Sequence, residues 1–293
     1  MTNVPDVPSG VDVKTATPAR IYDYWLRGHN HFAADRNAAL RVAEAAPEAP
    51  LLAVENRKFL RRAVRHLAAE AGVSQFLDIG SGLPTQGNVH AIAQQAAPGA
   101  RVVYVDNDPM VLAHSRALNT SESVAVIQAD LRDPRAILSH PETRRLLDFG
   151  EPLGLLFVAV LHFISPANDP ASLLAAFRAA IPPGSYLVVS HVTGDIHADS
   201  AARAAVEYKK IVPDATLRDR AEILRFFDGF DLIEPGLVQV PRWRPDEPPP
   251  PGADNVWMLG GVGRLPAEPA QAAVPRNHRQ GRRDSPATES YSE

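Results

Sequence analysis

Residues 75–85 read QFLDIGSGLPT, and this stretch decides the fold. The mostly apolar run 75–79 predicts a buried strand. Gly80 and Gly82 follow directly, and residues without a Cβ let the backbone turn tightly and approach a ligand closely. The dinucleotide-binding fingerprint requires a third glycine where this chain has Thr85. The stretch therefore predicts a strand, a ligand-binding turn and a helix, and it argues against a dinucleotide as the ligand.

Apolar runs alternate with helical segments across the rest of the chain. Such alternation predicts an α/β fold, a parallel sheet with helices on both faces. No helix separates the last two runs, so we expect these two to be antiparallel neighbours. The expected strands are 75–79, 101–106, 123–128, 153–159, 185–191, 232–240 and 255–262. The clearest helical segments between them are 88–97, 110–118 and 172–181.

A helical block precedes this sheet. Thr17 and Pro18 form a start signal, a capping residue followed by proline at the first helical position, and Gly72 is a typical C-terminal cap. The last segment of the chain has almost no large apolar side chains and cannot offset its ordering entropy by burial. We expect a flexible arm over 1–17, an N-terminal helical cap over 18–72, an α/β domain over 73–264 and a disordered tail over 265–293.

Basic side chains recur at helical spacing late in the cap block. We interpret them as a solvated helix face, with a local site for an acidic molecule as the alternative. The stripe consists of Arg57, Lys58, Arg61, Arg62 and Arg65.

Composition excludes several classes of protein. The chain has 293 residues, of which 45% are apolar and 22% charged, as in globular proteins. It has no cysteine, which excludes disulfides, thiolate nucleophiles and Cys-based metal sites. A net charge of -4 provides no basic field for a nucleic acid.

The longest apolar run, 153–164, is shorter than the roughly 20 residues that span a bilayer, and the start MTNVPDVPSG has no apolar signal region. We expect a cytoplasmic protein without nucleic-acid or membrane partners and without a metal site, and we leave homo-oligomerisation open.

Acidic residues follow the first three strands. Ligands of an open parallel sheet bind beyond the carboxyl ends of its strands. There, Asp106 can accept hydrogen bonds from a ribose diol. Asp130 can accept from an exocyclic amine of adenine while Leu131 packs on the ring, or it can cap the following segment. Asp78 would repel a pyrophosphate but could hold the ammonium group of an amino acid that carries a sulfonium. Asp108 is interpreted as a helix cap.

Two histidines follow the fourth and fifth strands. His162 could act as a general base, since histidine titrates near neutrality, or it could be a packed wall residue. His191 is a weaker candidate of the same kind. In the cap, a dense polar-aromatic set predicts a lid over an acceptor pocket, with a docking helix as the alternative. The candidate lid residues are Arg20, Tyr22, Tyr24, Trp25 and Asn30.

The order of these strand-end motifs resembles that of class I S-adenosylmethionine-dependent methyltransferases. The motifs read DIGSGLPT, VYVDNDP, QADLRDP, AVLHFI and GSYLVVSH. Over residues 11–264 the chain is similar, more specifically, to a bacterial family of S-adenosyl methyltransferases long catalogued as a domain of unknown function. That similarity lies in RIYDYWLRGHNHFAADR, ENRKFLRRAVR, SGLPTQGNVH, VPRWRPD and DNVWMLGGVGR.

The resemblance implies a Rossmann-like, seven-stranded, mostly parallel sheet with an antiparallel last strand, an N-terminal helical cap, and S-adenosylmethionine as cofactor. It implies that the turn after the first strand contacts the methionine part of the cofactor. The turns after the second and third strands would contact ribose and adenine, and the turn after the fourth strand would lie beside the sulfonium. Together with Asp78, the cofactor residues are Gly80, Ser81, Gly82, Asp106, Asn107, Asp130, Leu131, Ala159 and Val160. An Asn/Asp-Pro-Pro-aromatic motif, typical of enzymes that methylate nucleic-acid bases, is missing after the fourth strand.

These features favour a methyltransferase acting on oxygen or nitrogen of a small-molecule acceptor. One alternative is a non-catalytic S-adenosylmethionine-binding module, since no base is obvious. A nicotinamide-dependent oxidoreductase is a third and less favoured hypothesis, because Thr85 replaces the third glycine.

Overall fold

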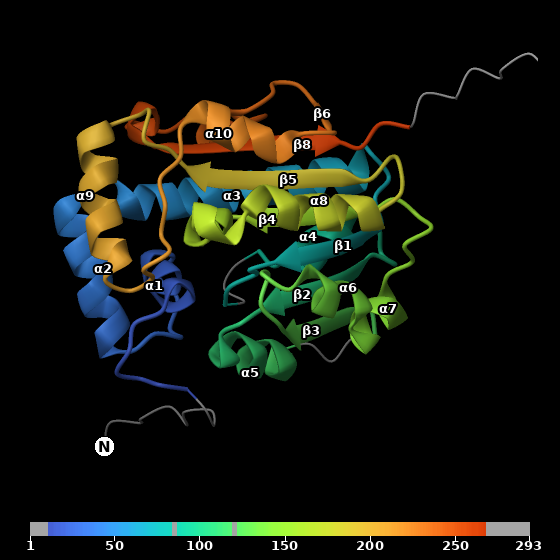
Figure 1. The fold of residues 1–293 in the computed structure, drawn as a ribbon, viewed down its shortest axis with the longest axis horizontal. Coiled ribbons are helices and arrows are strands. Elements are labelled where there is room, and N and C mark those ends of the chain that lie inside the picture. Colours follow the sequence, from blue (N-terminus) through green and yellow to red (C-terminus); the bar gives the residue numbers. More distant parts are fainter. Residues whose placement is uncertain (1–10, 84–86, 119–121, 268–293) are drawn as a thin grey trace, which may run out of the picture.

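The computed structural model describes residues 11–83, 87–118 and 122–267. A mixed β-sheet lies at the centre of the fold (Figure 1). Its strands are in the order β3-β2-β1-β4-β5-β8-β6, and β7 pairs with β8. The first five strands are parallel, and β8 runs antiparallel between β5 and β6. Their bounds are Gln75–Ile79 (β1), Arg101–Asp106 (β2), Val124–Gln128 (β3), Gly154–Val158 (β4), Tyr186–Val192 (β5), Asp231–Leu232 (β6), Val238–Gln239 (β7) and Met258–Arg264 (β8).

The α/β class and the antiparallel end of the sheet are confirmed, but one expected strand is divided. Residues 232–240 form two short strands, β6 and β7, so the sheet has eight strands instead of seven. Pro235 has no N–H to donate to a ladder, and Gly236 has a φ of +82°, outside the strand region. The apolar pattern of this segment is real, but its middle cannot pair.

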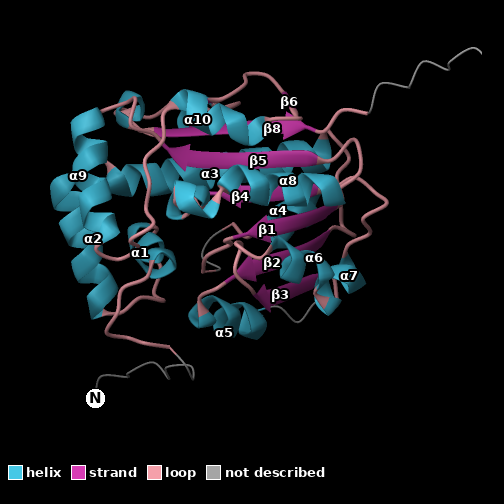
Figure 2. Cartoon of the chain, viewed as in Figure 1, coloured by secondary structure: helices cyan, strands magenta, loops and turns pink. Residues whose placement is uncertain are grey.

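Helices cover both faces of the sheet (Figure 2). Because side chains alternate along each buried strand, neighbours such as Phe76 and Leu77 enter two different cores. One core is covered by α3 (Ala49–Ala69) and α4 (Val89–Ala96). The other is covered by α6 (Pro134–Ser139), α7 (Pro141–Leu146), α8 (Pro170–Ala180) and α10 (Arg220–Leu224). Helix α5 (Pro109–Leu118) lies beside β2 and β3.

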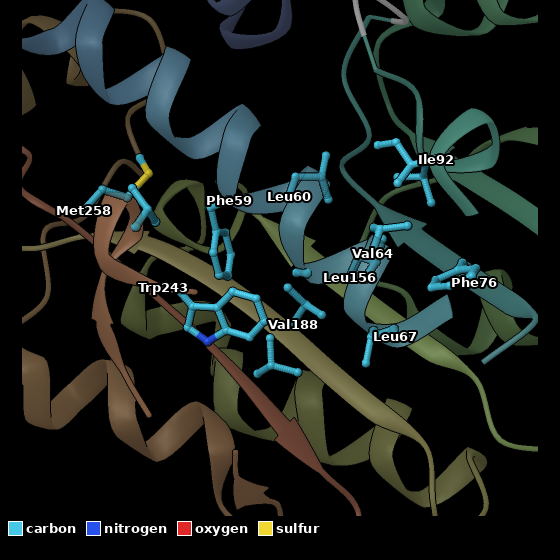
Figure 3. Close-up of a cluster of buried hydrophobic side chains, with 14 of the residues drawn as sticks. Phe59, Leu60, Val64, Leu67, Phe76, Ile92, Leu156, Val188, Trp243 and Met258 are labelled. Atoms are coloured by element: carbon cyan, nitrogen blue, oxygen red, sulfur yellow. The ribbon is translucent and has the colours of Figure 1, made fainter. Parts of the chain in front are cut away.

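Helix α3 joins the cap to the sheet. Figure 3 shows Phe59, Val64 and Leu67 of this helix beside Leu156 and Val188 of the sheet, and all five side chains are fully buried. The 21-residue helix therefore presents one continuous apolar face to the core.

The basic stripe of α3 does not form one face. Arg62 is buried, and it donates from Nε to the Trp243 carbonyl at 2.8 Å. Arg65 pairs with Asp246 on the outside, while Arg57 lines the cavity described below. The interpretation as a solvated face is therefore wrong for Arg62, which holds the segment before β8 by hydrogen bonds that only the folded chain provides.

The cap is built from two separate parts of the chain. Helices α1 (Pro18–Trp25) and α2 (Ala33–Ala45) pack together, and α9 (Ala198–Lys209), from the segment after β5, packs against α2. Figure 1 shows these three helices beyond the end of the sheet toward which β5 points. They therefore cover the edge where the parallel strands end. None of the helices within the described ranges is long and apolar enough to cross a membrane.

Candidate active site

A cavity of about 620 Å³ lies at this edge, between the strand ends and the cap helices. All ten residues expected to bind a cofactor line it, because each lies at the carboxyl end of β1, β2, β3 or β4 or in the turn that follows. They are Asp78, Gly80, Ser81, Gly82, Asp106, Asn107, Asp130, Leu131, Ala159 and Val160.

Asp106 is held by the backbone of two turns. Its Oδ2 accepts from Gly82 N and its Oδ1 from Asp108 N, both at 2.9 Å. Burial raises the pKa of Asp106 to about 6, although these backbone N–H groups favour its charged form. The carboxylate is therefore fixed in position and ready to accept further hydrogen bonds from a diol.

Asp78 is more deeply buried, with 5% of its surface exposed. Burial raises its pKa to about 7, the nearby Arg57 cation opposes this rise, and Asp106 adds to it. A buried carboxyl whose pKa lies near neutrality is stabilised in its ionised form by a cation placed beside it. The site thus favours a cationic ligand group at the end of β1.

The two glycines of the first turn have different roles. Both have positive φ, +70° at Gly80 and +65° at Gly82. A Cβ on Gly80 would lie 2.3 Å from Cγ2 of Val160, whereas a Cβ on Gly82 would meet no atom within 4 Å. Gly80 therefore lets the β1 and β4 turns pack together, and Gly82 borders open space.

Asp130 forms a local ion pair with Arg132, whose Nε lies 3.0 Å from both carboxylate oxygens. Its Oδ1 also accepts from the Arg132 backbone N–H at 2.9 Å. The Arg132 guanidinium lowers the pKa of Asp130, which keeps it ionised at neutral pH. The expected turn-capping role is present, and Asp130 also lines the cavity. The cap role of Asp108 is confirmed, since its Oδ1 accepts from Met110 N at 2.8 Å.

The turn after β4 is strained. Ala159 has a φ of +58°, a left-handed conformation that is unfavourable for alanine. Its N–H is bonded to Ser190 of β5, at 2.9 Å to Oγ and 3.2 Å to O. Ser190 Oγ in turn donates to Asn56 Oδ1 at 2.6 Å, and Asn56 Nδ2 donates to the Tyr22 hydroxyl at 3.0 Å. This hydrogen-bonded chain connects the β4 turn to cap helix α1.

His162 lines the cavity but is almost fully buried, and its Nδ1 has no hydrogen-bond partner among the described residues. Burial, with a smaller contribution from the Arg218 cation, lowers its pKa to about 3. The imidazole is therefore neutral at pH 7.

His191 does not line the cavity. It is fully buried, with Nδ1 2.6 Å from the Val192 carbonyl and Nε2 2.8 Å from an Arg218 guanidinium nitrogen. These partners require a donor at Nδ1 and an acceptor at Nε2, so both ring nitrogens are engaged. The structure places His191 behind the wall that carries His162.

The candidate lid residues separate into two groups. Arg20, Tyr22 and Trp25 line the cavity, whereas Tyr24 and Asn30 are not among its described lining residues. Arg20 Nε lies 3.1 Å from Asp35 Oδ1 in a buried ion pair. The Arg20 guanidinium also donates hydrogen bonds to the backbone carbonyls of Asp12 and Thr15. Its side chain holds residues 12–15, part of the expected flexible arm, against the cap, while residues 1–10 lie outside the described structure.

Other lining residues escape the sequence patterns. Asn56 of α3 is 1% exposed, and a polar residue on an otherwise apolar helix face was a usable signal. Tyr208 of α9 and Phe163 after β4 also line the cavity. Nothing in the sequence indicated that α9 would return to the cap, so Tyr208 had no such signal.

Comparison with known proteins places this cavity in context. A profile of the S-adenosyl methyltransferase family matches residues 6–266. A provisionally assigned methyltransferase of Thermobifida fusca is 44% identical, with a TM-score of 0.85 over 89% of this chain and 98% of its own. A DUF574 family protein of Streptomyces avermitilis is 41% identical, with the same TM-score over 87% of this chain and 99% of its own.

A more distant structure shares the fold alone. An O-methyltransferase family protein of Burkholderia thailandensis is 13% identical, with a TM-score of 0.51 over 81% of this chain and 61% of its own. None of the curated proteins compared with the chain matches it.

Proposed function

The chain belongs to the S-adenosyl methyltransferase family, and on that premise we propose that it methylates an oxygen or nitrogen of a small-molecule acceptor. The observation that carries this proposal is the set of carboxylates at three consecutive strand ends, Asp78, Asp106 and Asp130, around one cavity. An acidic rim of this kind suits a nucleoside that carries positive charge, and it disfavours the phosphates of a dinucleotide.

The residues present fit S-adenosylmethionine. Asp106, fixed by two backbone donors, would hold the ribose hydroxyls. Asp78, whose raised pKa favours an adjacent cation, would hold the ammonium group. The open space beside Gly82 leaves room for the methionine part. The remaining contacts would come from Gly80 and Ser81 on the methionine part, Asn107, Asp130 and Leu131 on adenine, and Ala159 and Val160 near the sulfonium.

When bound, the cofactor supplies an electrophilic methyl group on a leaving group that is already activated. The task of the chain is therefore alignment of donor and acceptor, which can lower a barrier by about 7–11 kcal/mol. The cap helices lie over the strand ends and restrict the access of water to this site.

His162 is the proposed catalytic residue. A neutral imidazole has one nitrogen lone pair, which can accept the hydrogen of a hydroxyl or amine acceptor and orient its nucleophilic electrons. Its pKa of about 3 makes it a weak proton acceptor in this state. His162 would thus orient the acceptor, and the proton that the acceptor loses on methylation would pass to the imidazole lone pair, because methylation makes that proton strongly acidic. The same low pKa favours, as the alternative, a protein that binds the cofactor without turnover.

Calorimetric titration tests the cofactor assignment. We expect micromolar binding of S-adenosylmethionine and S-adenosylhomocysteine and no binding of NAD⁺. Formation of S-adenosylhomocysteine in the presence of a metabolite extract would separate an enzyme from a binding module. Tight binding of NAD⁺ alone would contradict the proposal.

We also propose a cytoplasmic location, since a chain without cysteine fits a reducing compartment. Fractionation of the producing cells would check it.

A further inference from the structure

The cavity has two chemically different halves. Strand order places β3, β2 and β1 on one side of it and β4, β5 and β8 on the other. Neighbouring strands are about 4.8 Å apart, so the ends of β3 and β5 are separated by roughly 19 Å. The proposed cofactor carboxylates belong to the first half. The second half is lined by residues after β4, at the end of β5 and the start of β8, and by the cap helices.

The second half contains a belt of aromatic rings. We call Tyr22, Trp25, Phe163 and Tyr208 the aromatic belt, and all four line the cavity. The ring centroids of Trp25 and Tyr208 are 6.2 Å apart, and those of Phe163 and Tyr208 are 5.8 Å apart. Three separate segments supply these rings: α1, the turn after β4, and α9. Ring contacts therefore connect Trp25, Tyr208 and Phe163 across segments that meet only in the folded chain.

The belt lies beside the proposed transfer point. Tyr22 is linked through Asn56 and Ser190 to the N–H of Ala159. Phe163 packs against His162 with ring centroids 4.3 Å apart. Because Ala159 is proposed to border the sulfonium, the belt borders the space that an acceptor must enter.

One cation borders this half of the cavity: the guanidinium carbon of Arg57 lies 6.0 Å from the centre of the Tyr22 ring, and Arg57 also lines the cavity. Burial raises the pKa of the Tyr208 phenol, and burial lowers that of His162 to about 3, so neither is ionised at pH 7. Asp214 lies on the cofactor side, where its Oδ2 is 3.8 Å from Nη1 of Arg132. A cationic acceptor placed against the belt would lose its hydration and meet the positive charge of Arg57 in place of a counter-ion.

Two buried polar atoms of this region have no partner among the described residues. They are Nε1 of Trp25, which can only donate, and Nδ1 of His162. Buried polar atoms in proteins are nearly always hydrogen-bonded, so an unpartnered pair in a cavity wall points to a ligand with a polar group of its own.

We propose that the aromatic belt is the acceptor site and that it binds a flat aromatic molecule that carries no positive charge and bears a hydroxyl or aromatic amine group. This inference rests on the proposed methyl transfer. Edge-to-face and offset contacts between rings favour an aromatic ligand over a saturated one of the same size, and the Arg57 cation beside Tyr22 selects against cations.

Binding of three matched probes tests the proposal. S-adenosylhomocysteine is titrated first, and the saturated protein is then titrated with 2-naphthol, with its saturated analogue 2-decalol, and with 2-naphthylmethylamine, which is a cation at pH 7. We expect 2-naphthol to bind at least tenfold more tightly than either analogue. Equal or tighter binding of an analogue, or failure of 2-naphthol to bind, would overturn the aromatic acceptor. Failure of S-adenosylhomocysteine to bind would instead overturn the proposed function, whatever 2-naphthol does.

Variants assign the probe to the belt. Tyr208→Leu and Phe163→Leu remove a ring but keep apolar bulk, and each should weaken 2-naphthol binding by about tenfold. Tyr208→Phe keeps the ring and should bind normally, as should Leu224→Ala on the exposed surface. Affinity for S-adenosylhomocysteine should stay within twofold in all four variants, which shows that they are folded. Unchanged 2-naphthol binding in both ring-deleted variants would overturn the site.

Discussion

At the scale of single residues, the site depends on carboxylates whose environment is built by backbone groups. Asp106 lies at the end of β2, but its carboxylate accepts a hydrogen bond from the backbone N–H of Gly82, which lies in the turn after β1. A local sequence pattern identifies the acid, and its orientation comes from the contact between two turns.

Asp106→Ala should weaken S-adenosylhomocysteine binding by about 10- to 100-fold. Each hydrogen bond to a charged group contributes about 1.5–3 kcal/mol, and the variant also leaves Gly82 N and Asp108 N without their acceptor. Calorimetric titration measures the loss. Asp133→Ala, which removes an exposed helix cap, is the matched control and should bind normally. Binding of Asp106→Ala within a few-fold of the wild type would make the ribose assignment wrong.

Asp78 predicts a pH dependence. Its pKa of about 7 means that the carboxyl becomes ionised as pH rises through 7, so affinity for the ligand ammonium should increase between pH 6 and pH 8. The stability of the unliganded protein should change in the opposite direction. A carboxyl with a raised folded pKa favours the folded state at low pH, and this contribution is lost as pH rises through about 7.

Asp78→Asn separates these effects. At pH 8 it should stabilise the unliganded protein by at most about 4 kcal/mol, since one pKa unit corresponds to about 1.4 kcal/mol, while it weakens ligand binding. Denaturant unfolding at pH 6 and pH 8, with and without S-adenosylhomocysteine, measures both. A variant that keeps the pH dependence of binding would show that another group is responsible.

At the scale of elements, the β1 and β4 turns form one packed unit. Gly80 is needed because its missing side chain makes room for Val160, and the strain at Ala159 is held by β5. Two turns far apart in sequence therefore determine one another's backbone.

Gly80→Ala should be much more destabilising than Gly82→Ala. Both variants incur about 1–2 kcal/mol for a Cβ at positive φ, but only the first forces a Cβ within 2.3 Å of Val160. Gly82→Ala should chiefly weaken cofactor binding, because its methyl enters open cavity space. The double variant Gly80→Ala/Val160→Ala should recover part of the lost stability in thermal unfolding. An equal cost for both single variants would contradict the packing argument.

At the scale of the whole molecule, the cap is locked over the sheet by buried polar contacts. Asp35 of α2 accepts from Arg20 Nε and from the backbone N–H groups of Thr17 and Phe32. Thr17 also donates to Asp108 at 2.8 Å, which connects the segment before α1 to the sheet domain. The cap and the α/β unit therefore enclose one cavity as a single assembly.

Asp35→Ala should destabilise the protein by about 3–5 kcal/mol, because it leaves the Arg20 cation buried without its partner. Asp199→Ala, on the exposed surface of α9, should have little effect. Denaturant unfolding of both variants provides the comparison, and a loss below about 1 kcal/mol for Asp35→Ala would show that the buried pair does not hold the cap.

The sequence by itself determined the α/β class, the antiparallel end of the sheet and the ten residues at the strand ends. These features are local: the alternation of apolar runs and turn residues places a side chain at the end of a strand before any long-range contact is known. The expected single strand over 232–240 was wrong because it followed the apolar character of the segment, whereas pairing was limited by Pro235 and Gly236, which are themselves local signals.

Only the tertiary structure decided which distant side chains share the cavity. The orientation of α1 brings Tyr22 and Trp25 to the cavity and leaves Tyr24 outside its lining. His191 is buried behind the cavity wall that contains His162, and α9 returns Tyr208 to the cap. Packing, which no short segment encodes, also decided the charge of His162, since its low pKa comes from burial and from Arg218. Strand ends follow from local periodicity, whereas the acceptor half is created where three separate segments meet.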